Sequence, residues 1–599
     1  MLRYRIQPKN PQAHLFEVTL DVPVPDPTGQ AFRLPAWILG SYLIRDFAKH
    51  VVSIRGESEE RDVALTKTDK STWIADPCAA PLRIVMEVYA HDLSVRGAHL
   101  DTTHAYFNGT SVFLCVVGQE DVPCELDIVP PPEPLGKDWR VATSMRAKDA
   151  PQYGYGVYMA ESYAELVDHP VEIGDLQIGE FEAAGIPHAI AVRGRTRMDM
   201  GRVCRDLETV CEQHHKLLGA PADLDRYLFL LLVLGKGYGG LEHRWSSSLV
   251  SSRNELPGRG ETGVSDDYRR FLGLCSHEYF HLWNVTRMKP AAFVKHPLNE
   301  EAYTGLLWVF EGITSYYDDL ALVRAGLITE ESYFELLGQT ITRVLRTRGR
   351  LRQSVEESSF DAWTKFYKQD SGSPNFIVSY YAKGALVACA LDLTLRRITH
   401  GNVSLDDVMR ECWQRWGESG AGMPERGLES VASELCGVSL EDFFERYVRG
   451  TAELPLERLL NDCGVQLRLR AAQGRKDSGG APAKGDRPPA PSLGATLVTN
   501  GGRAVFKTVQ AGGAAERAGI APGDEAVALD DLKLTAGAAA ERIAGYRGGD
   551  TVTIAVFRGD ELLRFAVTLD EPEQDTCYLV VNADASETAV QQREAWLSG

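Results

Sequence analysis

Hydrophobic and polar positions alternate with a period of about two along the first part of the chain. The apolar runs are short and are separated by Pro, Gly and Asp turns; they are HLFEVTLDVPV (14–24), PLRIVMEVYA (81–90), SVFLCVVG (111–118) and CELDIV (124–129). Such runs are typical of strands that bury one face. The pattern predicts a β-sandwich over residues 1–168.

The periodicity changes to about 3.6 residues after this region. Apolar side chains recur at helical spacing in MDMGRVCRDLETVCEQHHKLLG (198–219), GLLWVFEGITSYYDDLALVRAG (305–326) and YYAKGALVACALDLTLRRIT (380–399). The apolar run YLFLLLVLG (227–235) reads instead as a buried strand. We therefore expect a mainly helical domain over residues 169–470.

Residues 471–492, AAQGRKDSGGAPAKGDRPPAPS, contain almost no large apolar side chains and cannot build a core. We expect a flexible linker there, a second β-rich unit over residues 493–582 and a solvated tail over residues 583–599. A chain of 599 residues is too long for one core and should form roughly three or four domains. The expected fold class is multidomain α+β.

Composition places the chain among ordinary globular proteins, with 44% hydrophobic and 25% charged residues. The net charge of −19 argues against nucleic acid or an anionic membrane surface as the main partner. The first residues lack the apolar core of a secretory signal, and no apolar run approaches membrane-spanning length. The 11 cysteines include no CxxC pair, so we expect free thiols and a cytoplasmic protein.

The segment CSHEYFHLWN (275–284) carries the first candidate chemistry. On a helix capped at Ser265, His277 and His281 lie one turn apart on one face, so both imidazoles can reach one metal ion. Glu278 is displaced by one position, which suits a base that takes a proton from water beside the metal. The alternative is a pair of structural histidines, and Cys275 reads as a small core residue.

A third ligand is needed, and Glu311 in LLWVFEGITSYYDDL is the best candidate. A carboxylate on such an apolar helix is costly to bury unless it is paired or metal-bound. Two imidazoles and one carboxylate leave a fourth tetrahedral position for water, as in hydrolytic zinc sites. We expect one zinc ion per chain, although cobalt or manganese would suit the same ligands. Alternatively, Glu311 caps a helix or faces solvent; Asp318 or Asp319 can support a ligand histidine.

Two further stretches bear on the substrate. In GYGGLEHRWSSSLV (237–250), Gly239 and Gly240 form a strand edge that a substrate backbone can approach, and Glu242 can hold a free α-ammonium group. In SYYAKGALV (379–387), the hydroxyl of Tyr381 suits a donor to a tetrahedral oxyanion. The alternatives are a surface turn for the glycines and aromatic packing for Tyr380 and Tyr381.

Together, HEYFHLWN, FEGITSYYDD, GGLEH and YYAKG resemble the glycyl aminopeptidase family of gluzincin zinc metallopeptidases. LPAWILGSYLIRDFAKHV (34–51) is similar to the N-terminal sandwich of that family, with Leu39 where a proline is usual, a departure that bears on loop geometry. The resemblance spans nearly all of residues 1–580. It implies a thermolysin-like catalytic domain and a C-terminal PDZ domain.

The resemblance also assigns roles to individual residues of this chain and implies a preference for N-terminal Gly or Ala. The implied zinc ligands are His277, His281 and Glu311, and the implied general base is Glu278. It further implies that Glu242 anchors the substrate N-terminus and that Tyr381 is the oxyanion donor, with Tyr380 as the competing choice.

The segment LGATL (493–497), followed by VQAGGAAERAGIAPGDEAVALDD (509–531), resembles a PDZ domain of the bacterial protease type. In such domains a strand edge pairs with an extended peptide while backbone amides hold its terminal carboxylate. We therefore expect peptide binding at Leu493, Gly494, Ala495, Thr496 and Leu497. The ligand is either a substrate tail or this chain's own catalytic domain, and the alternative is a small barrel with only a packing role.

These observations predict a zinc aminopeptidase that removes N-terminal residues, small ones by resemblance, from peptides with a free N-terminus. A zinc endopeptidase is the alternative within the same class. A catalytically inactive scaffold that binds peptide ends through its PDZ unit is the alternative from another class, and the intact ligands and base argue against it.

Overall fold

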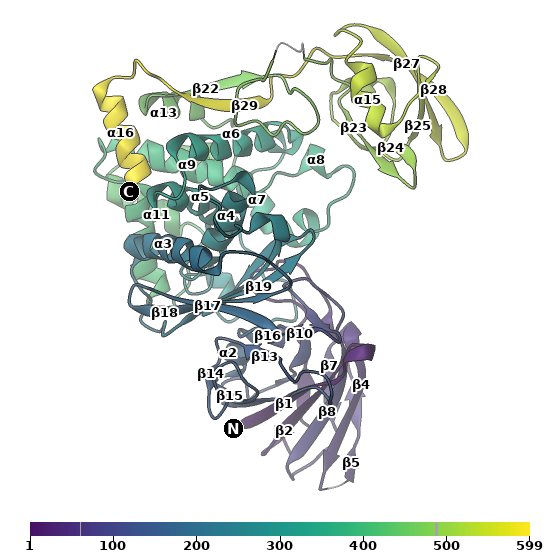
Figure 1. Ribbon diagram of the computed structural model, residues 1–599, viewed down its shortest axis with the longest axis vertical. Coiled ribbons are helices and arrows are strands. Elements are labelled where there is room, and N and C mark those ends of the chain that lie inside the picture. Colours follow the sequence, from purple (N-terminus) through teal and green to yellow (C-terminus); the bar gives the residue numbers. More distant parts are fainter. Residues whose placement is uncertain (60, 486–488) are drawn as a thin grey trace. The chain divides into compact units, whose positions relative to one another are not determined.

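A computed structural model describes residues 1–59, 61–485 and 489–599 (Figure 1). The chain divides into two compact units. The first contains Met1–Ala302 and Trp413–Met423, and the second contains Tyr303–Cys412 and Pro424–Gly599. No helix of the described ranges is both long and apolar enough to cross a membrane.

The N-terminal part of the first unit is β-rich, as predicted. Strand LFEVTLDV alternates regularly between buried and half-buried positions, so one face of its sheet lines the core. The eight-stranded sheet has the order β14–β15–β12–β1–β2–β8–β4–β5, with β1 (Leu2–Asn10), β2 (Leu15–Val22), β4 (Val51–Ser58), β5 (Arg61–Val63), β8 (Leu82–Tyr89), β12 (Cys124–Ile128), β14 (Arg146–Ala147) and β15 (Gly156–Ala160).

Two four-stranded sheets complete this β-rich part. Their orders are β13–β16–β10–β9 and β11–β3–β7–β6. Their strands are β3 (Ala31–Arg33), β6 (Leu65–Lys67), β7 (Thr72–Ala75), β9 (Ala98–Leu100), β10 (His104–Phe107), β11 (Cys115–Val116), β13 (Arg140–Ala142) and β16 (Val171–Gly174), and the short helices are α1 (Gly109–Val112) and α2 (Tyr163–Val167).

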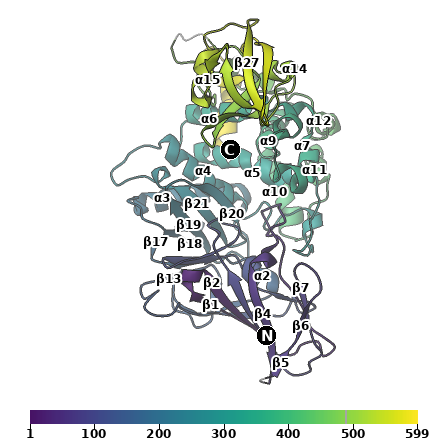
Figure 2. The same cartoon turned by 90° about the vertical axis from the view of Figure 1, so that its right-hand side faces the viewer.

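A five-stranded sheet follows in the same unit (Figure 2). Its order is β17–β18–β19–β21–β20, with β17 (Leu176–Ala183), β18 (Ile186–Arg193), β19 (Tyr227–Leu234), β20 (Tyr238–Glu242) and β21 (Ser246–Ser252). The predicted buried strand is β19, which runs parallel to both neighbours, and β20 is an edge strand antiparallel to β21. Helices α3 (Met200–Leu218) and α4 (Asp266–Phe280) pack against each other in this unit.

The second unit begins with the helical region that the 3.6-residue period predicted. Its helices are α5 (Ile313–Arg324), α6 (Glu330–Leu345), α7 (Val355–Phe360), α8 (Ser373–Phe376), α9 (Ala382–Ile398), α10 (Leu405–Cys412), α11 (Gly427–Cys436), α12 (Glu441–Tyr447) and α13 (Leu456–Asp462). A two-stranded ribbon joins β22 (Val465–Arg470) to β29 (Thr576–Val581).

The predicted PDZ fold is present in the second unit and has its own apolar core around Phe506, Ile554 and Val567. Its sheet has the order β23–β24–β25–β27–β28, with β26 paired to β25. The elements are β23 (Ala495–Asn500), β24 (Arg503–Val509), β25 (Glu525–Leu529), β26 (Leu532–Lys533), β27 (Thr551–Arg558), β28 (Glu561–Thr568), α14 (Ala514–Ala518) and α15 (Ala536–Ile543).

Two segments differ from the sequence expectation. In the expected flexible linker, the Asp477 carbonyl accepts a hydrogen bond from Arg346, the C-cap residue of α6, and Gly480 donates to the Cys577 carbonyl at 2.8 Å. Residues 486–488 of that linker lie outside the described residues. The expected solvated tail forms α16 (Glu587–Ser598), in which Trp596 is fully buried. Both segments are polar in composition, so their contacts with the rest of the unit could not be predicted from the sequence.

Candidate metal centre

Helix α4 holds the two histidines as the spacing predicts. Ser265 caps the helix, because its hydroxyl accepts a hydrogen bond from the Tyr268 amide at 3.2 Å. The helix ends at Phe280, and His281 keeps helical backbone angles as the C-cap residue. The Nε2 atoms of His277 and His281 lie 3.2 Å apart, with ring planes at 84° to each other. Nearly perpendicular rings let two in-plane lone pairs converge on one ion.

The tautomer of His281 fits a metal ligand. Its Nδ1 lies 2.7 Å from the Asn284 carbonyl oxygen, which can only accept, so Nδ1 carries the proton and Nε2 carries the lone pair. Metal-binding histidines characteristically donate the second ring nitrogen to a carbonyl or carboxylate in this way. The residues of α4 therefore fit a bound divalent cation.

Two buried carboxylates lie beside His281. Ligand atoms of Glu242, Glu278 and His281 are all within 4.8 Å of one another, and both glutamates are 5% exposed. Two glycines provide the space for them. A Cβ at Gly240 would overlap the Glu278 carboxylate, and a Cβ at Gly40 would overlap that of Glu242. The GGLEH motif at β20 and the segment 34–51 of the N-terminal part, which contains Gly40, thus meet at these two carboxylates.

Glu311 lies in a π-helical turn, η5 (Trp308–Gly312), directly before α5, and is 2% exposed. Such turns occur frequently at functional sites. Gly312 and Gly384 pack backbone against backbone, since a Cβ at Gly312 would meet Gly384 Cα at 2.6 Å. This close approach sets η5 against α9.

The tyrosines before α9 form a small hydroxyl cluster. The Tyr381 hydroxyl lies 3.1 Å from that of Tyr367, and the Tyr380 hydroxyl lies 3.4 Å from it. Tyr380 is fully buried, whereas Tyr381 is half-buried. The two tyrosines therefore differ in side-chain burial, although both hydroxyls lie close to that of Tyr367. Asp318 and Asp319 are half-buried on α5.

Sequence reasoning missed a buried polar layer behind α4. The His214 Nε2 atom lies 2.9 Å from the Ser276 hydroxyl, and the Tyr279 hydroxyl lies 2.7 Å from His188 Nε2 and 2.8 Å from His215 Nε2. Burial lowers the pKa of His188 to about 4. The sequence did offer one signal for this layer: the two neighbouring histidines of EQHHKLLG lie within a predicted helix. Their hydrogen bonds to Ser276 and Tyr279 fix the rotation of α4 about its axis.

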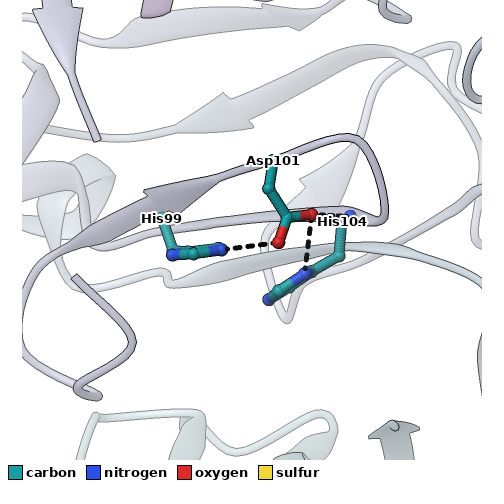
Figure 3. Close-up of side chains that lie close together, drawn as sticks. All are labelled: His99, Asp101 and His104. Atoms are coloured by element: carbon teal, nitrogen blue, oxygen red, sulfur yellow. Dashed lines mark hydrogen bonds and ion pairs between the residues drawn. The ribbon is translucent and has the colours of Figure 1, made fainter. Parts of the chain in front are cut away.

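Outside this site, a group of two histidines and one aspartate lies in the β9–β10 hairpin (Figure 3). His99 Nε2 is 3.1 Å from Asp101 Oδ2, and His104 Nδ1 is 3.5 Å from Asp101 Oδ1. The two rings stack at 4.6 Å and 27°, and both face the Asp101 carboxylate, unlike the nearly perpendicular α4 pair. Asp101 Oδ1 also accepts from the Thr103 amide at 2.6 Å. We interpret this group as a brace of the hairpin turn.

The predicted peptide-binding residues of the PDZ unit lie at the start of edge strand β23. Gly494 has a φ of +64° and contacts Gly513, where a Cβ would lie 2.7 Å from Gly513 Cα, so this position requires glycine. Leu493 and Leu497 are buried in the PDZ core. An open groove of about 800 Å³ runs along Ala495 and Thr496 beside α15.

Comparisons with known proteins agree with this arrangement. Residues 3–175 match the Peptidase M61 N-terminal domain, residues 270–387 match M61 glycyl aminopeptidase and residues 491–569 match the PDZ domain. Among curated proteins, none matches the chain.

Two solved structures illustrate the range of similarity. An aminopeptidase N family protein from Idiomarina loihiensis is 39% identical, with 100% of both chains covered and a TM-score of 0.94. An M1 zinc metallopeptidase from Deinococcus radiodurans is 12% identical, with 76% of this chain and 94% of that chain covered and a TM-score of 0.47. The family match and the full-length relative together lead to one conclusion: the chain belongs to the M61 glycyl aminopeptidase family and is a zinc metallopeptidase.

Proposed function

We propose that this zinc aminopeptidase removes small N-terminal residues, Gly or Ala, from peptides. The observation that carries the proposal is the grouping of Glu242, Glu278 and His281 within 4.8 Å. A carboxylate that can bind a free ammonium group therefore lies next to a base and a metal ligand, so the reacting amide is the first one in the peptide. An endopeptidase does not bind a free N-terminus next to its reacting amide, so it would not need the carboxylate of Glu242 at this position.

We assign one zinc ion per chain to His277, His281 and Glu311. Zinc supplies Lewis-acid polarisation of the scissile carbonyl and of water when it is bound. Glu278 takes the proton of the attacking water and later delivers it to the leaving amine. Its burial supports this role, because a dry environment strengthens its interaction with the reacting proton.

Glu242 and Tyr381 complete the proposed site. Glu242 holds the α-ammonium group through charge-assisted hydrogen bonds and so sets the register of the peptide. Tyr381 donates a hydrogen bond from its hydroxyl to the developing oxyanion. The PDZ groove along β23 takes the carboxyl-terminal end of an extended peptide by strand addition.

The test is hydrolysis of glycyl and alanyl peptide amides with free and acetylated N-termini, before and after chelation and zinc readdition. We expect turnover of the free peptides only, and loss of it on chelation. Glu278→Gln should retain zinc and lower kcat by at least about 100-fold. Hydrolysis of the acetylated peptides would instead indicate an endopeptidase, and absence of both zinc and turnover would indicate a peptide-binding scaffold.

A further inference from the structure

Arg96 extends from the N-terminal part of the first unit to the edge of the five-stranded sheet. Its Nη2 donates a hydrogen bond to the Gly240 carbonyl at 3.2 Å. Its Nη1 lies 3.9 Å from the place where a Cβ of Gly239 would be, so glycine at this position leaves room beside the guanidinium. Since β20 is an edge strand, Arg96 places a positive charge beside the strand that a substrate backbone would join.

This charge lacks a counter-ion within the described parts of the chain. None of their carboxylates forms an ion pair with Arg96, and its Nε has no hydrogen-bond partner there. Arg96 is half-buried. A guanidinium has five donors and pairs best with a planar carboxylate, so Arg96 retains the capacity to bind one.

The residues that flank Arg96 hold it in place. The carbonyl of Val95 accepts hydrogen bonds from the Tyr106 hydroxyl at 3.0 Å and from Asn108 Nδ2 at 2.6 Å. The Tyr106 hydroxyl also lies 2.8 Å from that of Ser248 on β21, the neighbour of β20. The hairpin brace at Asp101 follows directly (Figure 3). The backbone that carries Arg96 is therefore held in place, which reduces the entropy lost when its side chain binds a ligand.

The spacing of residues along β20 indicates which part of a bound peptide would lie near Arg96. Glu242 follows Gly240 by two residues on β20, a separation of about 7 Å at about 3.3 Å per residue. An extended dipeptide spans a similar distance between its ammonium and carboxylate groups. A short peptide whose N-terminus lies at Glu242 would thus place its carboxyl end near Gly239 and Gly240.

We propose that Arg96 is a specificity-determining residue that binds the terminal α-carboxylate of dipeptide substrates. The assignment rests on the proposed aminopeptidase function, in which Glu242 fixes the opposite end. It makes the enzyme a peptidase that favours short free peptides over long or amidated ones.

The experiment compares Ala-Ala with Ala-Ala amide in the zinc-loaded full chain. Arg96→Met should raise KM for the free acid by about 10- to 100-fold, the usual range for losing a charge-assisted hydrogen bond, and change KM for the amide by less than about threefold. Arg96→Lys should recover part of the loss. The matched control is Arg83→Met, which breaks the Arg83–Asp21 pair on β8 and β2 and should leave both substrates unaffected.

Equal effects on acid and amide would overturn the assignment, because they would show that Arg96 only supports β20. Calorimetry of Ala-Ala with the zinc-loaded Glu278→Gln protein supplies a readout without turnover. An unchanged Kd on adding the Arg96→Met substitution to that protein would also overturn the assignment. Absence of hydrolysis of both substrates by the unaltered enzyme would instead reject the proposed aminopeptidase function, and the calorimetric comparison would still decide the role of Arg96.

Discussion

Gly240 lies directly against the carboxylate of Glu278, so that a Cβ at residue 240 would overlap Glu278 Oε1. The second glycine of GGLEH therefore has two functions. It leaves this position of edge strand β20 without a side chain, and it defines the space in which the carboxylate of Glu278 is held.

Gly240→Ala should displace the Glu278 carboxylate while leaving His277 and His281 in place. A displacement near 1 Å can reduce catalysis by about 100-fold, so we expect kcat to fall by that order while bound zinc stays unchanged. Steady-state kinetics together with metal analysis would measure this. Gly235→Ala is the matched control, because nothing lies within 4 Å of a Cβ there. Loss of zinc in the alanine variant at position 240 would contradict the assigned cause.

Replacing the two tyrosines before α9 separates the two candidate oxyanion donors. Tyr381→Phe should lower kcat by about 100- to 1000-fold with little change in KM, because the lost hydrogen bond is made in the transition state. Tyr380→Phe should leave kcat nearly unchanged and cost about 1 kcal/mol of stability, since its buried hydroxyl bonds to Tyr367. Pre-steady-state and steady-state rates would distinguish the two. The reverse ranking would assign the role to Tyr380.

Acidification should loosen the β9–β10 hairpin. Burial and the neighbouring charge of His99 lower the pKa of His104 from 6.5 to about 4, against the opposing effect of Asp101. The unfolded chain therefore binds more protons between about pH 6.5 and pH 4, so stability is complete above this window and falls as the pH drops through it. The difference corresponds to about 3 kcal/mol of local stability.

Hydrogen exchange of residues 98–107, corrected for the intrinsic effect of pH, would measure this loss. His104→Gln should remove most of the dependence. His400→Asn serves as the control, because His400 is exposed and Asn tolerates its φ of 54°. The same pH dependence in the unaltered protein and in His104→Gln would show that other groups are responsible.

Helix α4 could be predicted from the sequence because the signals for it all lie within one segment. The i, i+4 spacing of His277 and His281, the cap at Ser265 and the apolar neighbours all lie within one segment. Helices α5 and α9 were predictable for the same reason, since a single period covers each of them, and strand β19 was predictable from its continuous apolar run. The GGLEH and YYAKG motifs indicated candidate residues, but the sequence could not predict how these residues lie in space.

The remaining features depend on contacts between distant segments. Arg96 carries no motif, and its importance comes from a bond to Gly240, 144 positions later. The seven residues of β21 include five serines yet are all buried, because α4 and side chains such as Tyr106 pack against this strand. Likewise, the histidines behind α4 are distinguishable from surface histidines only once Tyr279 lies between them.

The C-terminal helix should stabilise the helix that follows Glu311. Trp596 donates its indole N–H to the Tyr316 hydroxyl at 2.7 Å, and Arg324 donates to the Trp596 carbonyl at 3.0 Å. Arg324 also forms a buried ion pair with Asp406. Tyr316 and Arg324 both belong to α5, so α16 covers the helix that continues from the π-helical turn of Glu311.

Trp596→Ala should therefore cost about 3–5 kcal/mol, the range for removing a large buried aromatic side chain. We expect faster hydrogen exchange in residues 313–324 and weaker zinc binding, because loosening α5 releases the backbone that positions Glu311. Gln591→Ala, an exposed position on the same helix, should change neither measurement by more than about 0.5 kcal/mol. Unchanged zinc affinity in Trp596→Ala, with α5 exchange accelerated, would show that the π-helical turn holds Glu311 without support from α16.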